Sequence, residues 1–386
     1  MNETNNQTSS VPRLFRLTSL DGLRGLAAAI VLLHHALLTF PNLAGPYRPN
    51  AASVWSFNWW LTYTPLHLVW AGNEAVYLFF VLSGAVLTLS VVRNQAFDWV
   101  TYYPRRIIRL YGPVLVAIAI GYCLILLVPR DVVDELGNWV EGRPSSYPLA
   151  IVARDAALIL GSSGTVSPLW SLRWEVIFSL ALPLYVLLAK TRRIPVWITT
   201  TLSIGVLALG AALPNSYFFY LAIFALGAIL AGNWSRLTKL LDRPLPRWFW
   251  PAFFAGAVLL TLLRWELGGW GVPRGTSGAL NAVSVIGTAL LVVCAAFWPA
   301  ARHFLETRPL QWLGRISFSL YLVHEPIVIA SRFSTQSLSP WVGMAISIPT
   351  ALVIAAVFYR LVEQPCYRLA KRISRRSNTA PHPVVS

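Results

Sequence analysis

Runs of about twenty apolar residues recur along almost the whole length of this 386-residue chain. A helix of that length spans the hydrocarbon core of a bilayer. Charged residues make up only 12% of the chain and hydrophobic residues 56%, so the surface of a soluble protein of this size could not be covered. Disordered, coiled-coil, collagen-like and disulfide-rich secreted classes are excluded on the same grounds. We therefore expect an all-α, polytopic bundle in a membrane.

The apolar runs predict about ten transmembrane helices. They lie near residues 17–40, 73–92, 107–128, 170–189, 194–213, 217–233, 249–264, 279–298, 316–333 and 341–362. The expected division of the chain is a disordered polar tail at 1–16, a membrane domain at 17–367 and a basic cytoplasmic tail at 368–386. A piece at 150–160 is too short to span, and predicts either a surface helix or a re-entrant one.

The distribution of positive charge predicts the orientation. With the N-terminus inside, twenty-one of the thirty-one Lys and Arg residues fall in inner segments and seven in outer ones. Because Lys and Arg concentrate on the cytoplasmic side, this bias predicts that both termini are cytoplasmic. The net charge of +16 is therefore explained by the orientation of the chain in the cytoplasmic membrane. No nucleic-acid partner is expected. The three cysteines are far apart in the sequence and predict neither a disulfide framework nor a metal site.

The first span carries four ionisable residues, which are costly in lipid and mark functional sites. Arg24 and His35 are eleven residues apart, about three full helical turns, so they share one face about 16 Å apart along the axis. Asp21 lies close to that face, whereas His34 points about 80° away from Arg24. The pattern favours Asp21, Arg24 and His35 as one functional stripe, although a stripe that only packs helices remains an alternative.

A histidine buried near the middle of the membrane can stay neutral and accept a proton. His35 could therefore deprotonate a hydroxyl that attacks a thioester, or it could carry the acyl group itself. The sequence leaves both roles open.

Two later spans also contain ionisable residues. Arg173 and Glu175 open the fourth span from the outer side, as an interfacial ion pair or facing a cavity used by an acceptor. His324 and Glu325 lie near the middle of the ninth span beside Pro326, which is typical of a broken helix that lines a cavity.

The densest basic patch joined to a span is Y-Y-P-R-R-I-I-R at 102–109. Arg106 and Arg109 share one side of a helix, and guanidinium groups suit phosphate oxygens. Arg105, Arg106 and Arg109 thus predict a dock for a phosphorylated cytoplasmic donor, with ordinary anchoring to anionic lipid as the alternative.

Six motifs together resemble the membrane acyltransferase family 3 proteins. The first is the Arg, ten residues, His pattern of Arg24 and His35. In the same order follow F-F-V-L-S-G, which contains Ser83, then R-I-I-R at 106–109, W-S-L-R-W-E-V, I-S-F-S-L-Y-L-V-H and E-Q-P. The resemblance covers residues 17–367. The chain departs from it at R-W-E-V, which puts the role of Glu175 in doubt, and at G-N-E-A, where Glu74 stands in place of the usual Asp.

The resemblance implies an enzyme of the cytoplasmic membrane that moves an acetyl or other short acyl group from acyl-CoA, with acetyl-CoA as the expected donor, to a hydroxyl of a sugar, lipid or natural product. His35, Arg24, Asp21 and Glu175 are the expected catalytic residues. The expected cavity-lining residues are Glu74, Ser83, Arg173, His324 and Glu325. No appended extracytoplasmic hydrolase-like domain, permanently bound cofactor or metal is expected.

Two other functions are compatible with parts of the sequence. A transporter or flippase would also place ionisable groups in its spans, but the sequence shows no inverted repeat. An inactive relative that binds glycan or lipid is disfavoured because Arg24 and His35 are both present. The acceptor, the acyl chain length and the oligomeric state remain open.

Overall fold

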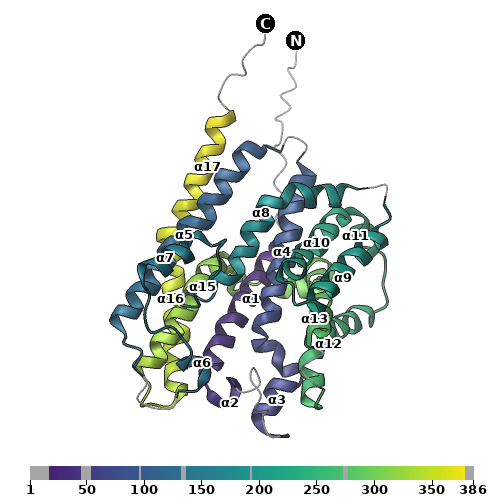
Figure 1. Ribbon diagram of the computed structural model, residues 1–386. Coiled ribbons are helices and arrows are strands. Elements are labelled where there is room, and N and C mark those ends of the chain that lie inside the picture. Colours follow the sequence, from purple (N-terminus) through teal and green to yellow (C-terminus); the bar gives the residue numbers. More distant parts are fainter. Residues whose placement is uncertain are drawn as a thin grey trace, which may run out of the picture.

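The computed structural model describes residues 17–44, 54–94, 97–131, 136–191, 194–272 and 277–378, and this part of the chain folds into helices and connecting turns (Figure 1). Eight helices are long and apolar enough to cross a membrane. A ninth span arises if α10 (Ser216–Gly232) and α11 (Trp234–Leu241), which meet at a bend of 63°, are counted as one. The chain is therefore a multi-pass membrane protein.

The eight long helices coincide with eight of the ten predicted spans. They are α1 (Thr18–Leu37), α4 (Gly72–Arg93), α5 (Trp99–Leu127), α8 (Leu169–Lys190), α12 (Phe249–Gly269), α13 (Ser277–Phe297), α15 (Arg308–Ser334) and α16 (Pro340–Phe358), which continues through a π-helical turn (Tyr359–Glu363) into α17 (Gln364–Asn378). The prediction of ten differs because α9 (Val196–Ala212) has only 17 residues and because α10 is bent against α11. All ten predicted segments are nevertheless helical.

Three helices extend beyond the apolar runs that predicted them. The predicted start at 107 lies eight residues into α5, because Asp98 caps the helix by accepting a hydrogen bond from Thr101 N at 3.1 Å. The helix α15 likewise begins at Arg308, and α17 continues α16 with a basic sequence.

In Figure 1 the start of α5 and α17 lie at the upper end, opposite α2 (Pro41–Ala44), α3 (Phe57–Tyr63) and α6 (Asn138–Glu141). Helices from the predicted inner and outer segments thus gather at opposite ends.

The helix α1 crosses α15 at very short range. A Cβ atom added to Gly25 would lie 2.4 Å from the backbone N of Gly314, and one added to Gly314 would lie 2.3 Å from the carbonyl O of Asp21. Real Cβ atoms do not approach so closely, so this crossing requires glycine on both helices. The two backbones can therefore bring side chains near the outer end of α1 into contact with α15.

The outer segment before α8 turns back into the bundle. Its helix α7 (Leu149–Ala157) lies beside the middle of α5, where Tyr111 donates from its hydroxyl to the carbonyl O of Ala157 at 3.2 Å. The buried Asp155 fixes the return by accepting from Ser163 N and Tyr147 Oη, both at 2.8 Å. Asp155 is the buried residue of α7, so this helix lies on the side of the bundle against α5. The start of α8 lies inside the bundle, where Leu169 and Ser171 are buried.

Candidate active site

His35 in the last turn of α1 meets His324 on α15. Nδ1 of His35 lies 3.0 Å from Nε2 of His324, and the ring centroids are 4.9 Å apart. His35 lies in the last turn of α1, toward the end of the helix that leads into α2. The close crossing of α1 and α15 explains how two residues 289 positions apart can share a hydrogen bond.

The surrounding acceptors determine which nitrogens carry protons. Nδ1 of His324 lies 3.0 Å from the carbonyl O of Leu320 and 2.9 Å from that of Tyr321, so this nitrogen must be the donor. Nε2 of a neutral His324 is then an acceptor. Nδ1 of His35 faces that acceptor and also the carbonyl O of Val31 at 3.0 Å, so it too carries a proton. The lone pair of His35 is therefore on Nε2, as inferred from the hydrogen-bond network.

His34 is held in a different environment. Its Nδ1 lies 2.8 Å from the carbonyl O of Trp70, and the side chain is buried. Its ring packs so closely on α4 that a Cβ atom at Gly72 would lie 2.4 Å from Cγ of His34. The structure thus places His34 in the contact between α1 and α4, whereas His35 lies beside α15.

Part of the outer segment lies over His35. The Trp139 ring centroid is 5.7 Å from that of His35, and the guanidinium of Arg143 lies over the same indole at 4.2 Å. Arg143 also pairs with the buried carboxylate of Glu325, whose second oxygen accepts from Ser167 N at 3.2 Å. The carboxylate of Glu325 on α15 is therefore bound to the outer loop through Arg143 and to the segment before α8 through Ser167 N, next to the histidine pair.

A small cavity of about 50 Å³ adjoins the histidines and is called the His35 pocket. Its lining is formed by Val31, His34, His35, Gly72, Asn73, Val76, Ser167, Pro168, Trp170 and Tyr321. The hydroxyl of Tyr321 lies 2.7 Å from Oγ of Ser171 in a buried pair. The pocket is therefore polar at the histidines and bounded by aromatic and aliphatic side chains, as expected of a site that binds a small organic group.

The predicted donor-binding Arg106 contacts the predicted catalytic Glu175 directly. The two side chains form an ion pair, and Nε of Arg106 donates to Oγ of Ser179 at 2.9 Å. Glu175 was expected near the outer end of its span, either in an interfacial ion pair with Arg173 or facing an acceptor cavity. Because α8 begins inside the bundle, Glu175 instead lies against α5, where it fixes the guanidinium of Arg106.

The other inner arginines belong to the same charged region. Glu363, which accepts from Oγ of Ser319 at 2.5 Å, is within electrostatic range of both Arg24 and Arg109. The guanidinium of Arg109 also lies 5.1 Å from the ring centroid of Tyr367. Arg24, Arg106 and Arg109 thus converge from α1 and α5, with Glu175 and Glu363 as counter-charges.

Two further inner residues lie at the margin of this region. Asp21 is one turn before Arg24, and its carbonyl packs against Gly314. Arg105 is within electrostatic range of Asp98 at the start of α5.

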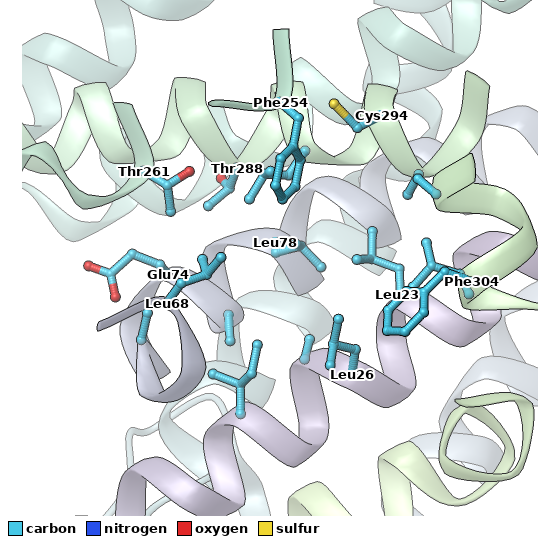
Figure 2. A pocket seen from close by; sticks show the side chains of 18 of the residues that line it. Leu23, Leu26, Leu68, Glu74, Leu78, Phe254, Thr261, Thr288, Cys294 and Phe304 are labelled. Atoms are coloured by element: carbon cyan, nitrogen blue, oxygen red, sulfur yellow. The ribbon is translucent and has the colours of Figure 1, made fainter. Parts of the chain in front are cut away.

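Three of the predicted cavity-lining residues are not brought to His35. Arg173 donates to the hydroxyl of Tyr217 at 2.6 Å, on the side of α10. Glu74 lines a separate, larger cavity (Figure 2) and accepts from Nε1 of Trp265 at 2.9 Å. Ser83 lines neither of these two cavities. They lie elsewhere because a helical position specifies the face of one helix, but not which neighbour packs on it.

Sequence reasoning missed four residues around His35, namely Trp139, Arg143, Ser167 and Tyr321. Trp139 and Arg143 are four residues apart around α6, and the site is completed when their loop folds back over α15. No pattern in the sequence predicts that the loop of Trp139 and Arg143 packs over α15. Tyr321 was within reach, because it lies three residues before His324 and so shares its face of α15.

Comparison with known proteins identifies the family. A family model described as an acyltransferase domain matches residues 17–360, most of the chain. The chain belongs to the acyltransferase 3 family. Acyltransferase MdmB of Streptomyces mycarofaciens is 27% identical over 97% of both chains. O-acetyltransferase OatA of Staphylococcus aureus (strain NCTC 8325 / PS 47) is 25% identical over 90% of this chain, which spans 57% of that longer protein. No solved structure matches the chain significantly.

Family membership makes the protein an acyltransferase of a membrane, with an acyl donor and an acceptor as its substrates. In the described part of the chain, no cluster of three or more His, Cys, Asp or Glu side chains is arranged to hold a metal ion.

Proposed function

We propose that the chain is an O-acyltransferase of the cytoplasmic membrane that moves an acetyl or other short acyl group from acyl-CoA to a hydroxyl. The observation that carries the proposal is the set of hydrogen bonds of His35 and His324, from which we infer that Nε2 of His35 is unprotonated. A neutral imidazole held in one tautomer is the usual general base of acyl transfer. Both termini would be cytoplasmic, in keeping with the bias of Lys and Arg.

The donor would bind with its phosphates at Arg24, Arg106 and Arg109. Glu175 fixes the orientation of Arg106, and a guanidinium held in one orientation binds phosphate oxygens with less loss of entropy. Arg24 and His35 are separated by about 16 Å along α1, a length that the extended pantetheine arm of CoA can cover. The thioester would then lie near the His35 pocket while the nucleotide stays at the inner end.

In the reaction, the acceptor oxygen attacks the thioester carbonyl while Nε2 of His35 takes the hydroxyl proton. The carbon–sulfur bond then breaks, and the imidazolium returns the proton to the CoA thiolate. During this step the positive charge on His35 is stabilised by the hydrogen bond from its Nδ1 to His324. Formation of an acyl-imidazole on His35 would use the same nitrogen.

The acceptor would approach from the outer side, past Trp139 and Arg143. The indole of Trp139 presents an aromatic face next to His35, suited to the apolar face of a sugar ring or to a hydrophobic natural product. The name of one relative, O-acetyltransferase OatA, supports a hydroxyl acceptor, because it denotes transfer of an acetyl group to oxygen.

The function is tested with the purified chain in lipid nanodiscs and acetyl-CoA. We expect release of free CoA thiol that rises when a hydroxyl acceptor is added, and a higher thermal midpoint in the presence of acetyl-CoA, because a ligand that binds only the folded state stabilises it. A transporter or flippase, the alternative function, would show neither effect. Mass spectrometry of envelope glycans and lipids from cells with and without the protein should then reveal the missing ester.

A further inference from the structure

Besides the histidines, the His35 pocket is lined by the polar residue Asn73 in the first turn of α4. Val76 lies three residues further along α4 and lines the same pocket, so the two side chains share one face of the helix. Gly72, the residue before Asn73, packs on the ring of His34. The first turn of α4 therefore lies beside the histidines of α1, and Asn73 faces the same pocket as His35.

The side-chain amide of Asn73 is free to bind a ligand. It has no hydrogen-bond partner among the described residues, and the residue is only partly buried. The hydroxyl of Tyr321, in contrast, is already used as a donor. Oγ of Ser171 donates to the carbonyl O of Pro168 at 3.0 Å, so it must accept from Tyr321 at 2.7 Å. Asn73 thus brings two unused N–H donors to a pocket in which His35 presents an acceptor.

The start of α4 favours negative charge next to Asn73. The residue that precedes the helix is Ala71, whose side chain cannot cap it. The N–H groups of the first turn therefore stay uncapped by a side chain and carry the positive end of the helix dipole. The carboxyl group of Glu74 in the same turn faces α12, where it accepts from Nε1 of Trp265 at 2.9 Å.

Ser167 offers a second free hydroxyl in the pocket, but in different electrostatic surroundings. Its side chain also has no hydrogen-bond partner among the described residues. Its backbone N–H, however, is bound to the carboxylate of Glu325 at 3.2 Å. Because a carboxylate repels a second negative charge, an oxygen that becomes negative is better placed at Asn73 than at Ser167.

The size of the pocket limits what lies against Asn73. Its volume is about 50 Å³, and one water molecule needs roughly 10–15 Å³. The pocket therefore has room for a few non-hydrogen atoms, such as an acetyl group, but not for a sugar ring or the nucleotide of CoA. The carbonyl oxygen of an acetyl group in this space has to lie against the pocket wall.

We propose that Asn73 is a catalytic residue whose Nδ2 donates a hydrogen bond to the carbonyl oxygen of the acyl group. The inference rests on the proposed function. As the acceptor oxygen bonds to the carbonyl carbon, the electron pair of the carbon–oxygen double bond moves onto the carbonyl oxygen. The amide of Asn73 and the start of α4 stabilise this charge. The pair returns when the carbon–sulfur bond breaks and the CoA thiolate leaves, while His35 holds the proton of the acceptor.

The hydrogen bond is tested directly by infrared spectroscopy of acetyl-CoA that carries an isotopic label at the carbonyl, bound to the purified full-length protein in nanodiscs. A hydrogen bond weakens the carbonyl bond, so we expect the band at a lower frequency in the wild type than in Asn73→Ala. An identical band in the two proteins overturns the inference and leaves the proposed function standing. If the wild type binds no acetyl-CoA, the proposed function fails and the inference fails with it.

Kinetics separate a catalytic role of Asn73 from a structural one. With methyl glucoside or water as the acceptor, we expect Asn73→Ala to lower kcat for CoA release by roughly 10²–10³-fold, with little change in KM for acetyl-CoA. Asn73→Asp keeps the shape of the side chain but loses both donors and adds a negative charge. It should lose at least as much activity, although its thermal midpoint stays the same or rises, because a carboxylate in the first turn of a helix is stabilising. Wild-type kcat in both variants, or a larger loss in Ser167→Ala than in Asn73→Ala, would overturn the assignment.

Discussion

His35→Asn is expected to lower acyl transfer by roughly 10²–10⁴-fold, the usual contribution of a general base. Asparagine retains a nitrogen donor near the position of Nδ1, so the contacts with Val31 and His324 can persist. It has no basic atom at the position of Nε2. The rate of CoA release in the presence of a hydroxyl acceptor, measured at matched protein amounts, gives the loss directly.

His34→Asn is the matched control for this prediction. The amide nitrogen can still donate to the carbonyl O of Trp70, which Nδ1 of His34 contacts at 2.8 Å. Because His34 faces α4, we expect this variant to retain most of the activity. Equal losses in the two variants would show that the adjacent histidines are not distinguished by their orientation, and the assignment of His35 would fail.

Arg143→Met is expected to destabilise the protein substantially, because it leaves the carboxylate of Glu325 buried without its cation. Removing one partner of a buried ion pair costs roughly 3–5 kcal/mol. We expect the lower part of that range, since the side chain of Arg143 is 15% exposed. The thermal midpoint of the purified variant in nanodiscs measures the loss.

The double variant Arg143→Met with Glu325→Gln separates charge burial from simple loss of packing. Glutamine keeps an oxygen acceptor for Ser167 N, which contacts Glu325 at 3.2 Å, and no uncompensated charge remains. The double variant should therefore be more stable than Arg143→Met alone. A double variant as unstable as the single one would argue against the ion pair as the link between the outer loop and α15.

The features that the sequence predicted well are those that depend on a single helix and not on its neighbours. Twenty apolar residues must form a helix in lipid, so each predicted span is helical. Orientation about an axis follows from 3.6 residues per turn, which separated His35 from His34. The same reasoning could not find the partner of His35. The close approach of α15 to α1 depends on contact between Gly25 and Gly314, which are far apart in the sequence.

The remaining errors have the same physical origin. Arg106 and Glu175 were assigned to opposite sides because α8 was assumed to begin at the outer surface. The start of α8 is instead buried in the bundle, and the two charges pair. Glu74 was expected to line a functional cavity and does line one, but the cavity is apolar and lies on the far side of α1 from His35. Such placements depend on tertiary contacts that no local pattern encodes.

In the proposed mechanism, the hydrogen bond from Nδ1 of His35 to Nε2 of His324 holds the base in its reactive tautomer and stabilises its charged form. The most direct test compares His324→Leu with His324→Gln in steady-state acyl transfer. Loss of one hydrogen bond to a charged group, roughly 1.5–3 kcal/mol, corresponds to about 10–100-fold in rate. We predict that His324→Leu loses kcat by this factor with little change in KM for acyl-CoA, and that the amide oxygen of His324→Gln restores most of it. Wild-type kcat in His324→Leu, or an equal loss in both variants, would contradict the account.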